Sequence, residues 1–259
     1  MNLELAGKIA IVGGASQGIG YGIATALAQE GATVAITARR EGDLHKAAER
    51  LRADSGATIL PIQADCRRAD DCARVADTAC RELGGIDILV NNDGAPPLGP
   101  VVSFDDAAWG KAIEQNFMYV VRMARACMPS MQSRGGGSIL NITAISAIQP
   151  IPGFGLSVAS WSAVIGYAKT LSIEVASSNI NVNTICPGYI DTSRLQKVFA
   201  ASGENPDVVK AKLTDQIPMK RIGTTEDIAS LVALLVSPKG RYITGTAIQV
   251  DGGLLRSVR

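Results

Sequence analysis

Short, almost continuous apolar runs alternate with longer amphipathic runs from one end of the chain to the other. An apolar run of this kind suits a strand that is buried on both faces, and an amphipathic run suits a helix with one buried face. The alternation is typical of βαβ units around a parallel sheet. It predicts an α/β fold with a doubly wound, seven-stranded parallel sheet and helices on both faces.

By length alone, the 259 residues suit one large domain or two small ones, and seven strands in one sheet favour a single domain, 1–259. The predicted strands are Lys8–Val12, Thr33–Thr37, Thr58–Ile62, Ile86–Val90, Gly137–Ile142, Asn181–Ile185 and Thr246–Val250. The predicted helices are Gly18–Glu30, Gly42–Ala53, Ala69–Leu83, Asp105–Ser133, Leu156–Ser177 and Glu226–Ser237. The segment Tyr189–Lys220 is charged and weakly periodic, which predicts a long loop of the kind that is more often functional than idle.

Charge is balanced, because 25 Lys and Arg residues face 24 Asp and Glu residues and leave a formal charge of +1. No block of like charges occurs, so neither a nucleic-acid partner nor a basic membrane-binding surface is expected. No apolar run approaches the ~18 residues of a membrane span, and the N-terminus has no cleavable signal pattern, so we expect a cytoplasmic protein. The five cysteines form no CxxC motif and His45 is the single histidine, so no metal site is predicted.

A glycine-rich segment, Gly13–Gly20, follows the first predicted strand and opens the first predicted helix. Gly14, Gly18 and Gly20 are spaced as GxxxGxG. Such glycines let the backbone turn tightly and approach a pyrophosphate, which then binds free N–H groups at the positive end of the helix. A plain strand-to-helix turn could carry the same glycines, but their position at the first βα junction favours nucleotide binding.

Two arginines follow the second predicted strand, at the place where NAD-binding folds carry an acid for the ribose 2′-hydroxyl. No carboxylate stands there. Arg39 and Arg40 instead offer forked donors for a 2′-phosphate, which favours NADP(H) over NAD(H). The alternative is a solvated basic turn, since Gln17 adds no second cation from the glycine segment.

Further motifs occur in order along the chain: Ala64–Asp65, Asn91–Gly94, Asn116, Pro187–Thr192 and Ile243–Gly253. Together with the glycine segment they resemble the short-chain dehydrogenase/reductase (SDR) family, in its single-domain type similar to 3-oxoacyl-(acyl carrier protein) reductases. The resemblance implies a Rossmann-type fold, a small-molecule substrate bound at 189–220, and a homotetramer or dimer, or a mixed oligomer with an active relative. The cofactor-binding residues expected for NADP(H) are Gly14, Ser16, Gln17, Gly18, Ile19, Gly20, Arg39, Arg40, Asp65, Cys66, Asn92, Gly94, Pro187, Gly188, Ile190 and Thr192.

The catalytic positions depart from the family pattern. Members interconvert a carbonyl and an alcohol with a Ser, a Tyr and a Lys four residues after the Tyr. The resemblance aligns these positions without a gap to Ala144, Ser157 and Trp161. Tyr167 and Lys169 cannot replace the pair, because residues two apart face different sides of a helix, whereas residues i and i+4 share one.

Other polar side chains near these positions are candidates for an acid, a base or a hydrogen-bond donor. Asn116 matches the family Asn that holds a water in the proton path, and Asp93 replaces the small residue of the family's NNAG. A carboxylate there could act as acid or base if burial raised its pKa, or it could simply be a hydrogen-bonded turn residue. The catalytic candidates are Asn116, Ser157, Ser146, Thr143 and Asp93.

Three functions fit this pattern. The first is an NADP(H)-dependent oxidoreductase that acts on a carbonyl/alcohol or imine pair through a non-standard active site. The second is a non-redox enzyme on the same fold, a lyase, hydratase or isomerase, and the third is a catalytically inactive regulatory subunit. Apolar residues of the 189–220 segment, with Arg194 and Lys197 nearby, suit a medium-sized apolar substrate that carries an anion.

Overall fold

The computed structural model describes residues 2–92, 94, 96–201 and 203–257. Its centre is a parallel sheet of seven strands in the order β3-β2-β1-β4-β5-β6-β7, which confirms the predicted fold class. The strands are β1 (Ile9–Val12), β2 (Thr33–Ala38), β3 (Ile59–Gln63), β4 (Ile88–Asn91), β5 (Gly137–Ile142), β6 (Ile180–Pro187) and β7 (Ala247–Val250). Every residue of β1, β4 and β6 is buried, as the continuous apolar runs predicted.

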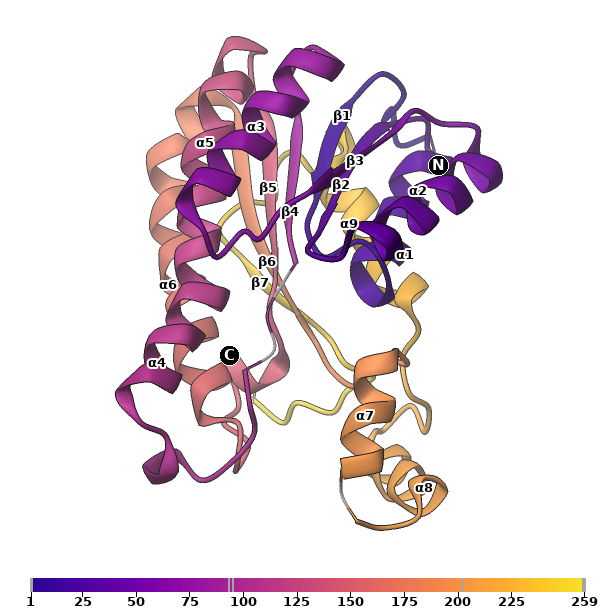
Figure 1. Ribbon diagram of the computed structural model, residues 1–259, viewed down its shortest axis with the longest axis vertical. Coiled ribbons are helices and arrows are strands. Elements are labelled where there is room, and N and C mark those ends of the chain that lie inside the picture. Colours follow the sequence, from indigo (N-terminus) through magenta and orange to yellow (C-terminus); the bar gives the residue numbers. More distant parts are fainter. Residues whose placement is uncertain (1, 93, 95, 202, 258–259) are drawn as a thin grey trace.

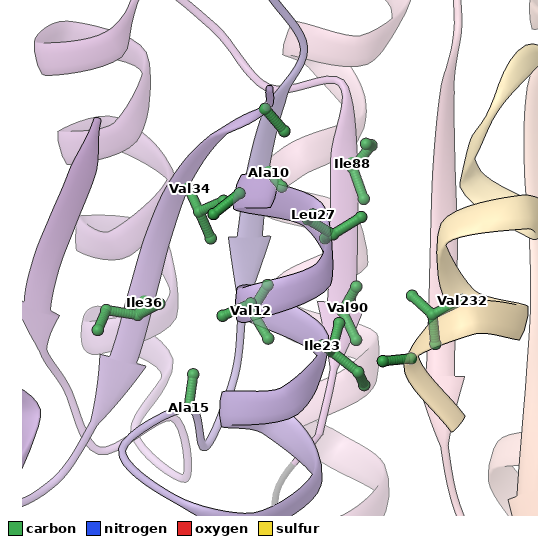
Figure 2. Packing of buried hydrophobic residues seen from close by; sticks show 14 of the residues in the cluster. Ala10, Val12, Ala15, Ile23, Leu27, Val34, Ile36, Ile88, Val90 and Val232 are labelled. Carbon is green, nitrogen blue, oxygen red and sulfur yellow. The ribbon is translucent and has the colours of Figure 1, made fainter. Parts of the chain in front are cut away.

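Helices cover both faces of this sheet (Figure 1). One face carries α1 (Gly18–Gln29), α2 (Glu41–Ser55) and α9 (Thr225–Val236), and the other carries α3 (Ala69–Leu83), α5 (Tyr119–Ser133) and α6 (Gly155–Val175). Figure 2 shows the first layer in detail, where Ile23 and Leu27 of α1 pack against Val12 and Val90. Residues far apart in the chain therefore share one apolar core on each face.

The strand order reverses between β1 and β4, because β2 lies on one side of β1 and β4 lies on the other. In open α/β sheets, ligands bind in the crevice beyond the carboxyl ends of the strands at such a switch point. The glycine segment follows β1 there, and Asn92 follows β4. The topology therefore brings together two of the motifs on which the cofactor prediction rests.

The segment predicted as a long loop is largely helical, which corrects the sequence prediction. It contains α7 (Ser193–Ala201) and α8 (Pro206–Gln216). Two apolar side chains one turn apart, Leu195 and Phe199, are buried and hold α7, while the Asn205 side chain accepts a hydrogen bond from the Asp207 N–H at the start of α8. Charged and polar residues make up much of this segment, so its sequence shows no clear helical period.

The predicted helix Asp105–Ser133 is also divided, into α4 (Asp106–Ile113), a π-helical turn (Glu114–Met118) and α5. A π turn adds one residue inside a continuous helix and is frequent at functional sites. The apolar period continues on either side, so the pattern alone could not reveal the interruption. Asn116 lies within the π turn and is buried.

Figure 1 shows α4 on one side, and α7 with α8 on the other, at the same end of the molecule. Both groups follow strands, β4 and β6 respectively, so they lie beyond the carboxyl ends of the sheet. None of the helices in the described ranges is both long and apolar enough to cross a lipid bilayer.

Candidate active site

The glycine segment is held at the switch point by the residue that follows β4. The Asn92 side-chain amide donates to the Gly13 carbonyl oxygen at 3.0 Å. A Cβ atom on Gly20 would lie 2.6 Å from Asn92 Nδ2 and 2.6 Å from the Gly14 carbonyl oxygen, and Gly14 and Gly18 have φ angles of +57° and +62°. These positions require glycine for space or for backbone conformation.

The N-terminus of α1 is open to an anion. Gln17 occupies the cap position but makes no side-chain capping bond, and the first turn contains no acidic residue. Ser16, Gln17 and Ile19 are partly exposed or exposed around this turn. The first N–H groups of a helix lack intrahelical partners and favour negative charge, so this end suits the pyrophosphate of a dinucleotide.

The two arginines after β2 are not equivalent. Arg40 Nε pairs with Asp43 Oδ2 at 2.9 Å, whereas the Arg39 guanidinium has no ion-pair partner among the residues that the structure describes. Arg39 lies close enough to Asp65 to help lower the pKa of that carboxyl. Of the two predicted phosphate ligands, Arg39 is therefore the one with a free guanidinium.

Asp65 and Cys66 lie after β3 on the same side. The Arg67 guanidinium binds both Asp65 carboxylate oxygens, one of them at 2.7 Å, and this is the main reason that the pKa of Asp65 is lowered. The Cys66 carbonyl oxygen accepts a hydrogen bond from the Cys72 thiol. An adenine that contacts Asp65 must therefore share that carboxylate with Arg67.

The segment after β6 closes the other end of the crevice. Gly188 donates to Val250 at 2.9 Å and packs on Asp251, which leaves no room for a Cβ atom. Thr192 lies next to Gly18. A Cβ atom built on this glycine would lie 3.6 Å from Thr192 Cγ2. In the same segment, Pro187 and Ile190 are both buried. Gly18 and Thr192, which belong to motifs far apart in the chain, are thus neighbours.

Asn116 is fixed by a residue that sequence reasoning missed. Its Nδ2 donates to Ser160 Oγ at 2.8 Å, and Ser160 Oγ donates in turn to the Leu156 carbonyl oxygen at 2.7 Å. The Asn116 Oδ1 atom is buried and has no hydrogen-bond partner among the described residues, and it faces Gly94, where a Cβ atom would collide with it. Ser160 is one of several serines on α6, and only its contact with Asn116 distinguishes it, so no signal in the sequence pointed to it.

Both serine candidates have buried hydroxyl groups without hydrogen-bond partners in the described ranges. They are Ser146, in the turn after β5, and Ser157, in the first turns of α6. Ser162 Oγ donates to the Ala147 carbonyl oxygen at 3.0 Å and so ties that turn to α6. Buried polar atoms are rarely left unpaired, which sets these two hydroxyl groups apart from the bonded serines of α6.

The remaining catalytic candidates differ from these. Thr143 Oγ1 donates to the Ile185 carbonyl oxygen at 3.1 Å and lies 3.2 Å from Cys186 Sγ, so its hydroxyl proton serves the β5–β6 contact. Asp93 lies outside the described residues. Trp161 is 8% exposed and belongs to the apolar core that α3, α5 and α6 cover. Ala144 packs against the same core.

Tyr167 and Lys169 have different surroundings, as their spacing predicted. The Tyr167 ring packs edge-on against Phe117 at a centroid distance of 6.0 Å, and burial raises the pKa of its hydroxyl. Lys169 lies beside Gly245, at the other side of α6. The two side chains do not form a Tyr/Lys pair.

Comparison with known proteins agrees with this architecture. Residues 14–255 match the family profile described as enoyl-(acyl carrier protein) reductase. Human dehydrogenase/reductase SDR family member 4 is 36% identical over 250 residues, which cover 96% of this chain and 88% of the relative. The chain belongs to the short-chain dehydrogenase/reductase family.

Two further SDR proteins extend the comparison. The 3-oxoacyl-(acyl-carrier-protein) reductase of Staphylococcus epidermidis is 35% identical over 248 residues, which cover 95% of this chain and 98% of the relative. The crystal structure of L-sorbose reductase from Gluconobacter frateurii, complexed with NADPH and L-sorbose, is 33% identical and has a TM-score of 0.96 over the full length of both chains. Homologues of this SDR protein are thus oxidoreductases.

In this SDR protein the crevice therefore combines two parts. One is a cradle with open helix N–H groups and the Arg39 guanidinium, which can hold a phosphorylated dinucleotide. The other is the meeting of the π turn, the turn after β5 and α6, which carry the buried side chains of Asn116, Ser146 and Ser157. Hydroxyl and amide groups of this kind can position a substrate, but none of them titrates near neutral pH.

Proposed function

We propose that this SDR protein is an NADP(H)-dependent oxidoreductase that acts on a carbonyl/alcohol or imine pair through a non-standard active site. The observation that carries the proposal is the dinucleotide cradle, in which the uncapped N-terminus of α1 and the unpaired Arg39 guanidinium lie beyond the carboxyl ends of β1 and β2. The proposal is supported by L-sorbose reductase, which shares the fold and was crystallised with NADPH and L-sorbose.

The residues present fit NADP(H). The uncapped N-terminus of α1 would hold the pyrophosphate, and the unpaired Arg39 would bind the 2′-phosphate. The segment Pro187–Thr192 would contact the nicotinamide, which supplies or accepts a hydride when the cofactor is bound. Bidentate binding of a phosphate by arginine is a charge-assisted interaction that NADH, without the 2′-phosphate, cannot make.

The site is non-standard because Ala144, Ser157 and Trp161 occupy the family's Ser, Tyr and Lys positions. A serine hydroxyl is a far weaker acid than a phenol, and the indole of Trp161 has one N–H donor and no charge. A positioned acid with a suitable pKa contributes roughly 10²- to 10⁴-fold to the rate. We therefore expect this protein to reduce an unactivated ketone more slowly than a relative with the full set, by about that factor.

Titration with NADPH and NADH, followed by stopped-flow oxidation of NADPH against ketones, aldehydes and imines, tests the proposal. We expect tighter binding of NADPH than of NADH and turnover of at least one of these substrate classes. Failure to bind NADPH would refute the proposal. Binding without turnover of any class would support an inactive regulatory subunit, which the Ser157 and Trp161 substitutions also favour.

A gain-of-function variant tests the non-standard site directly. The triple change Ala144→Ser, Ser157→Tyr and Trp161→Lys restores the family set on a scaffold that already orients Asn116. Reduction of a ketone should rise about 10²- to 10⁴-fold. The double change without Trp161→Lys is the matched control, since tyrosine then lacks its cation, and equal activity of the two would contradict the assignment of these positions.

A homo-oligomer, dimer or tetramer, is part of the proposed function. Apolar side chains remain exposed on the described surface, including Ile173 of α6 and Tyr242 before β7, with 71% and 104% relative exposure. Singly exposed side chains are normal on a protein surface, so the support for this part is the assembly that the family resemblance implies. Light scattering of the purified protein should give the mass of two or four chains, and a monomer at micromolar concentration would refute this part.

A further inference from the structure

A carboxylate lies beside the arginine that is proposed to bind the 2′-phosphate. β2 and β3 are neighbours in the sheet, with Ala38 in register with Gln63. Beyond these strand ends, the Ala64 N–H donates to the Ala38 carbonyl oxygen at 3.1 Å, and the Gln63 side-chain amide donates to the Arg39 carbonyl oxygen at 3.1 Å. Neighbouring strands lie about 4.8 Å apart, so the segments that carry Arg39 and Asp65 run side by side. Arg39 accordingly helps to lower the pKa of Asp65.

An uncompensated Asp65 carboxylate would oppose a phosphate bound at this place. A phosphate monoester carries about −1.5 to −2 charges at pH 7. A further negative charge about 10 Å away in water weakens its binding about threefold. Arg39 and Asp65 by themselves have no net charge, so a preference for the phosphorylated nucleotide would gain from a second cation.

Arg67 is such a cation, and it holds the Asp65 carboxylate with three donors. Its Nε donates to Oδ1 at 2.7 Å, its Nη2 donates to Oδ2, and its backbone N–H donates to Oδ1 at 3.2 Å. The side-chain hydrogen bonds are the main cause of the lowered pKa of Asp65, so this carboxyl is ionised and paired at neutral pH. With Arg39 included, two cations and one anion leave this group with a formal charge of +1.

The turn that carries the Asp65–Arg67 pair is also held through its backbone. Arg122 Nη1 donates to the Arg67 carbonyl oxygen at 2.8 Å, and Asp71 Oδ2 accepts a hydrogen bond from the Asp65 N–H at 2.8 Å. The Arg68 N–H donates to the Asp65 carbonyl oxygen at 2.8 Å. Because these contacts use main-chain atoms of the two paired residues, a change of the Arg67 side chain should leave the turn in place.

Two further arginines near this turn act on a different acid. Arg74 Nη2 pairs with Asp71 Oδ1 at 2.8 Å, and Arg68 also helps to lower the pKa of Asp71. The charges that lower the pKa of Asp65 are instead those of the two arginines described above. The charge next to the proposed phosphate site therefore depends on how completely Asp65 is neutralised.

Building on the proposed function, in which Arg39 binds the 2′-phosphate, we propose that Arg67 is a second determinant of the preference for NADP(H) over NAD(H). It neutralises the Asp65 carboxylate, which would otherwise repel the phosphate. Oδ2 accepts one hydrogen bond from Arg67 and keeps a lone pair for a donor such as the adenine amine. Arg67 thus determines specificity at the adenosine end of the cofactor and takes no part in hydride transfer.

The first test measures nucleotide fragments that contain only the adenosine end. Calorimetry with the full-length protein compares adenosine 2′,5′-bisphosphate with adenosine 5′-monophosphate at about 10 mM ionic strength, where the Debye length is about 30 Å. The ratio of the two affinities should fall about threefold or more in Arg67→Ala. It should change little in Arg67→Lys, which keeps the charge. An unchanged ratio in Arg67→Ala, or an equal fall in Arg67→Lys, would overturn the proposal.

The second test predicts a change of the opposite sign. Asp65→Asn removes the negative charge, and any lost contact with adenine affects both fragments alike and cancels in the ratio. The ratio should therefore rise about threefold or more above the wild-type value. Combining Asp65→Asn with Arg67→Ala restores the net charge and should return the ratio close to that of the wild type. An unchanged or lower ratio in Asp65→Asn would show that Asp65 does not oppose the phosphate, and would overturn the proposal.

Arg81→Ala is the matched control for loss of one positive charge. Arg81 is an exposed arginine in the last turn of α3, and its Nε pairs with Glu82 Oε1 at 2.9 Å. We expect its affinity ratio to equal that of the wild type, and an equal fall in Arg81→Ala and Arg67→Ala would refute a local role. The effect of Arg67→Ala should also vanish at about 1 M salt, where the Debye length is about 3 Å. Persistence of the full effect there would indicate a steric cause and contradict the charge argument.

The same ratios measured with NADPH and NADH by fluorescence separate this inference from the proposed function. Failure of the wild-type protein to bind NADPH would refute both. A preference for NADPH that Arg67→Ala leaves intact would refute only the role of Arg67. The thermal midpoint of Arg67→Ala should change little, because exposed ion pairs contribute little to stability. A loss of NADPH affinity that is matched by an equal loss of NADH affinity would point to a structural role and overturn the inference.

Discussion

Replacement of Gly20 by alanine should damage both the fold and the cofactor cradle. The added Cβ would lie 2.6 Å from Asn92 Nδ2, 2.6 Å from the Gly14 carbonyl oxygen and 2.7 Å from the Gly13 carbonyl oxygen. Ordinary contacts begin at 3.4 Å, so two backbone groups and a braced amide must each move by several tenths of an ångström. Overpacking of this kind costs roughly 1–3 kcal/mol.

The helical gain of alanine over glycine, about 0.5–1 kcal/mol, offsets part of that cost. We therefore expect the free energy of unfolding to fall by about 1 kcal/mol, and Tm to fall by roughly 2–4 °C. NADPH affinity should fall about tenfold or more, because the backbone that approaches the pyrophosphate is the part that moves.

Gly166→Ala on α6 is the matched control. Gly166 is exposed in a helix, and a Cβ there would meet nothing within 4 Å. Its Tm should rise by about 1–4 °C and its NADPH affinity should not change. The assay is thermal unfolding of both variants, with fluorescence titration of NADPH. A Gly20→Ala protein that unfolds at or above the wild-type temperature, or that binds NADPH normally, would refute the packing argument.

The remaining predictions concern charged side chains. Arg39→Ala should weaken the affinity for NADPH about tenfold or more and leave the affinity for NADH unchanged. Arg40→Ala should change neither affinity much. Equal losses of affinity for both nucleotides in Arg39→Ala would contradict the 2′-phosphate assignment. The Arg221 guanidinium holds the pKa of the Asp227 carboxyl far below its usual range, so its stabilisation is complete above about pH 4 and is lost as the pH falls. Asp227→Asn should therefore lower the free energy of unfolding by about 1 kcal/mol at pH 7, and this difference should narrow in denaturant titrations below pH 4. Asp87 accepts hydrogen bonds from the Ile9 N–H of β1 and from two guanidinium nitrogens of Arg134. Asp87→Asn should therefore lower the free energy of unfolding by about 1.5–3 kcal/mol in the same assay. A smaller loss than for Asp227→Asn would contradict this ranking.

Much of the cofactor crevice could be predicted because its motifs follow strands of a parallel sheet. Once the strand order is that of a doubly wound sheet, Gly14, Asn92 and Thr192 must meet at the carboxyl ends of β1, β4 and β6. The sequence pattern did not predict α7 and α8. Burial of Leu195 and Phe199 and the Asn205 cap stabilise these helices, and none of these contacts produces a clear amphipathic period.

The individual side chains of the catalytic crevice were less predictable. Thr143 and Ser146 are equally polar in the sequence, but only the structure shows that Thr143 donates to Ile185 while the Ser146 hydroxyl has no partner among the described residues. Arg39 and Arg40 look alike as neighbours, and a carboxylate three residues after Arg40 distinguishes them. Each of these outcomes depends on which partner lies within about 3 Å.

The sequence by itself determined the alternation of strands and helices and the glycine turn after the first strand. These are properties of local pattern and of residue type, which need no knowledge of contacts. Only the tertiary structure decided the direction of the Asn116 amide, because that depends on Ser160, 44 positions away, whose own proton is already given to Leu156. A hydrogen bond needs both a donor and an acceptor within about 3 Å, and only the fold decides which residues meet at that distance.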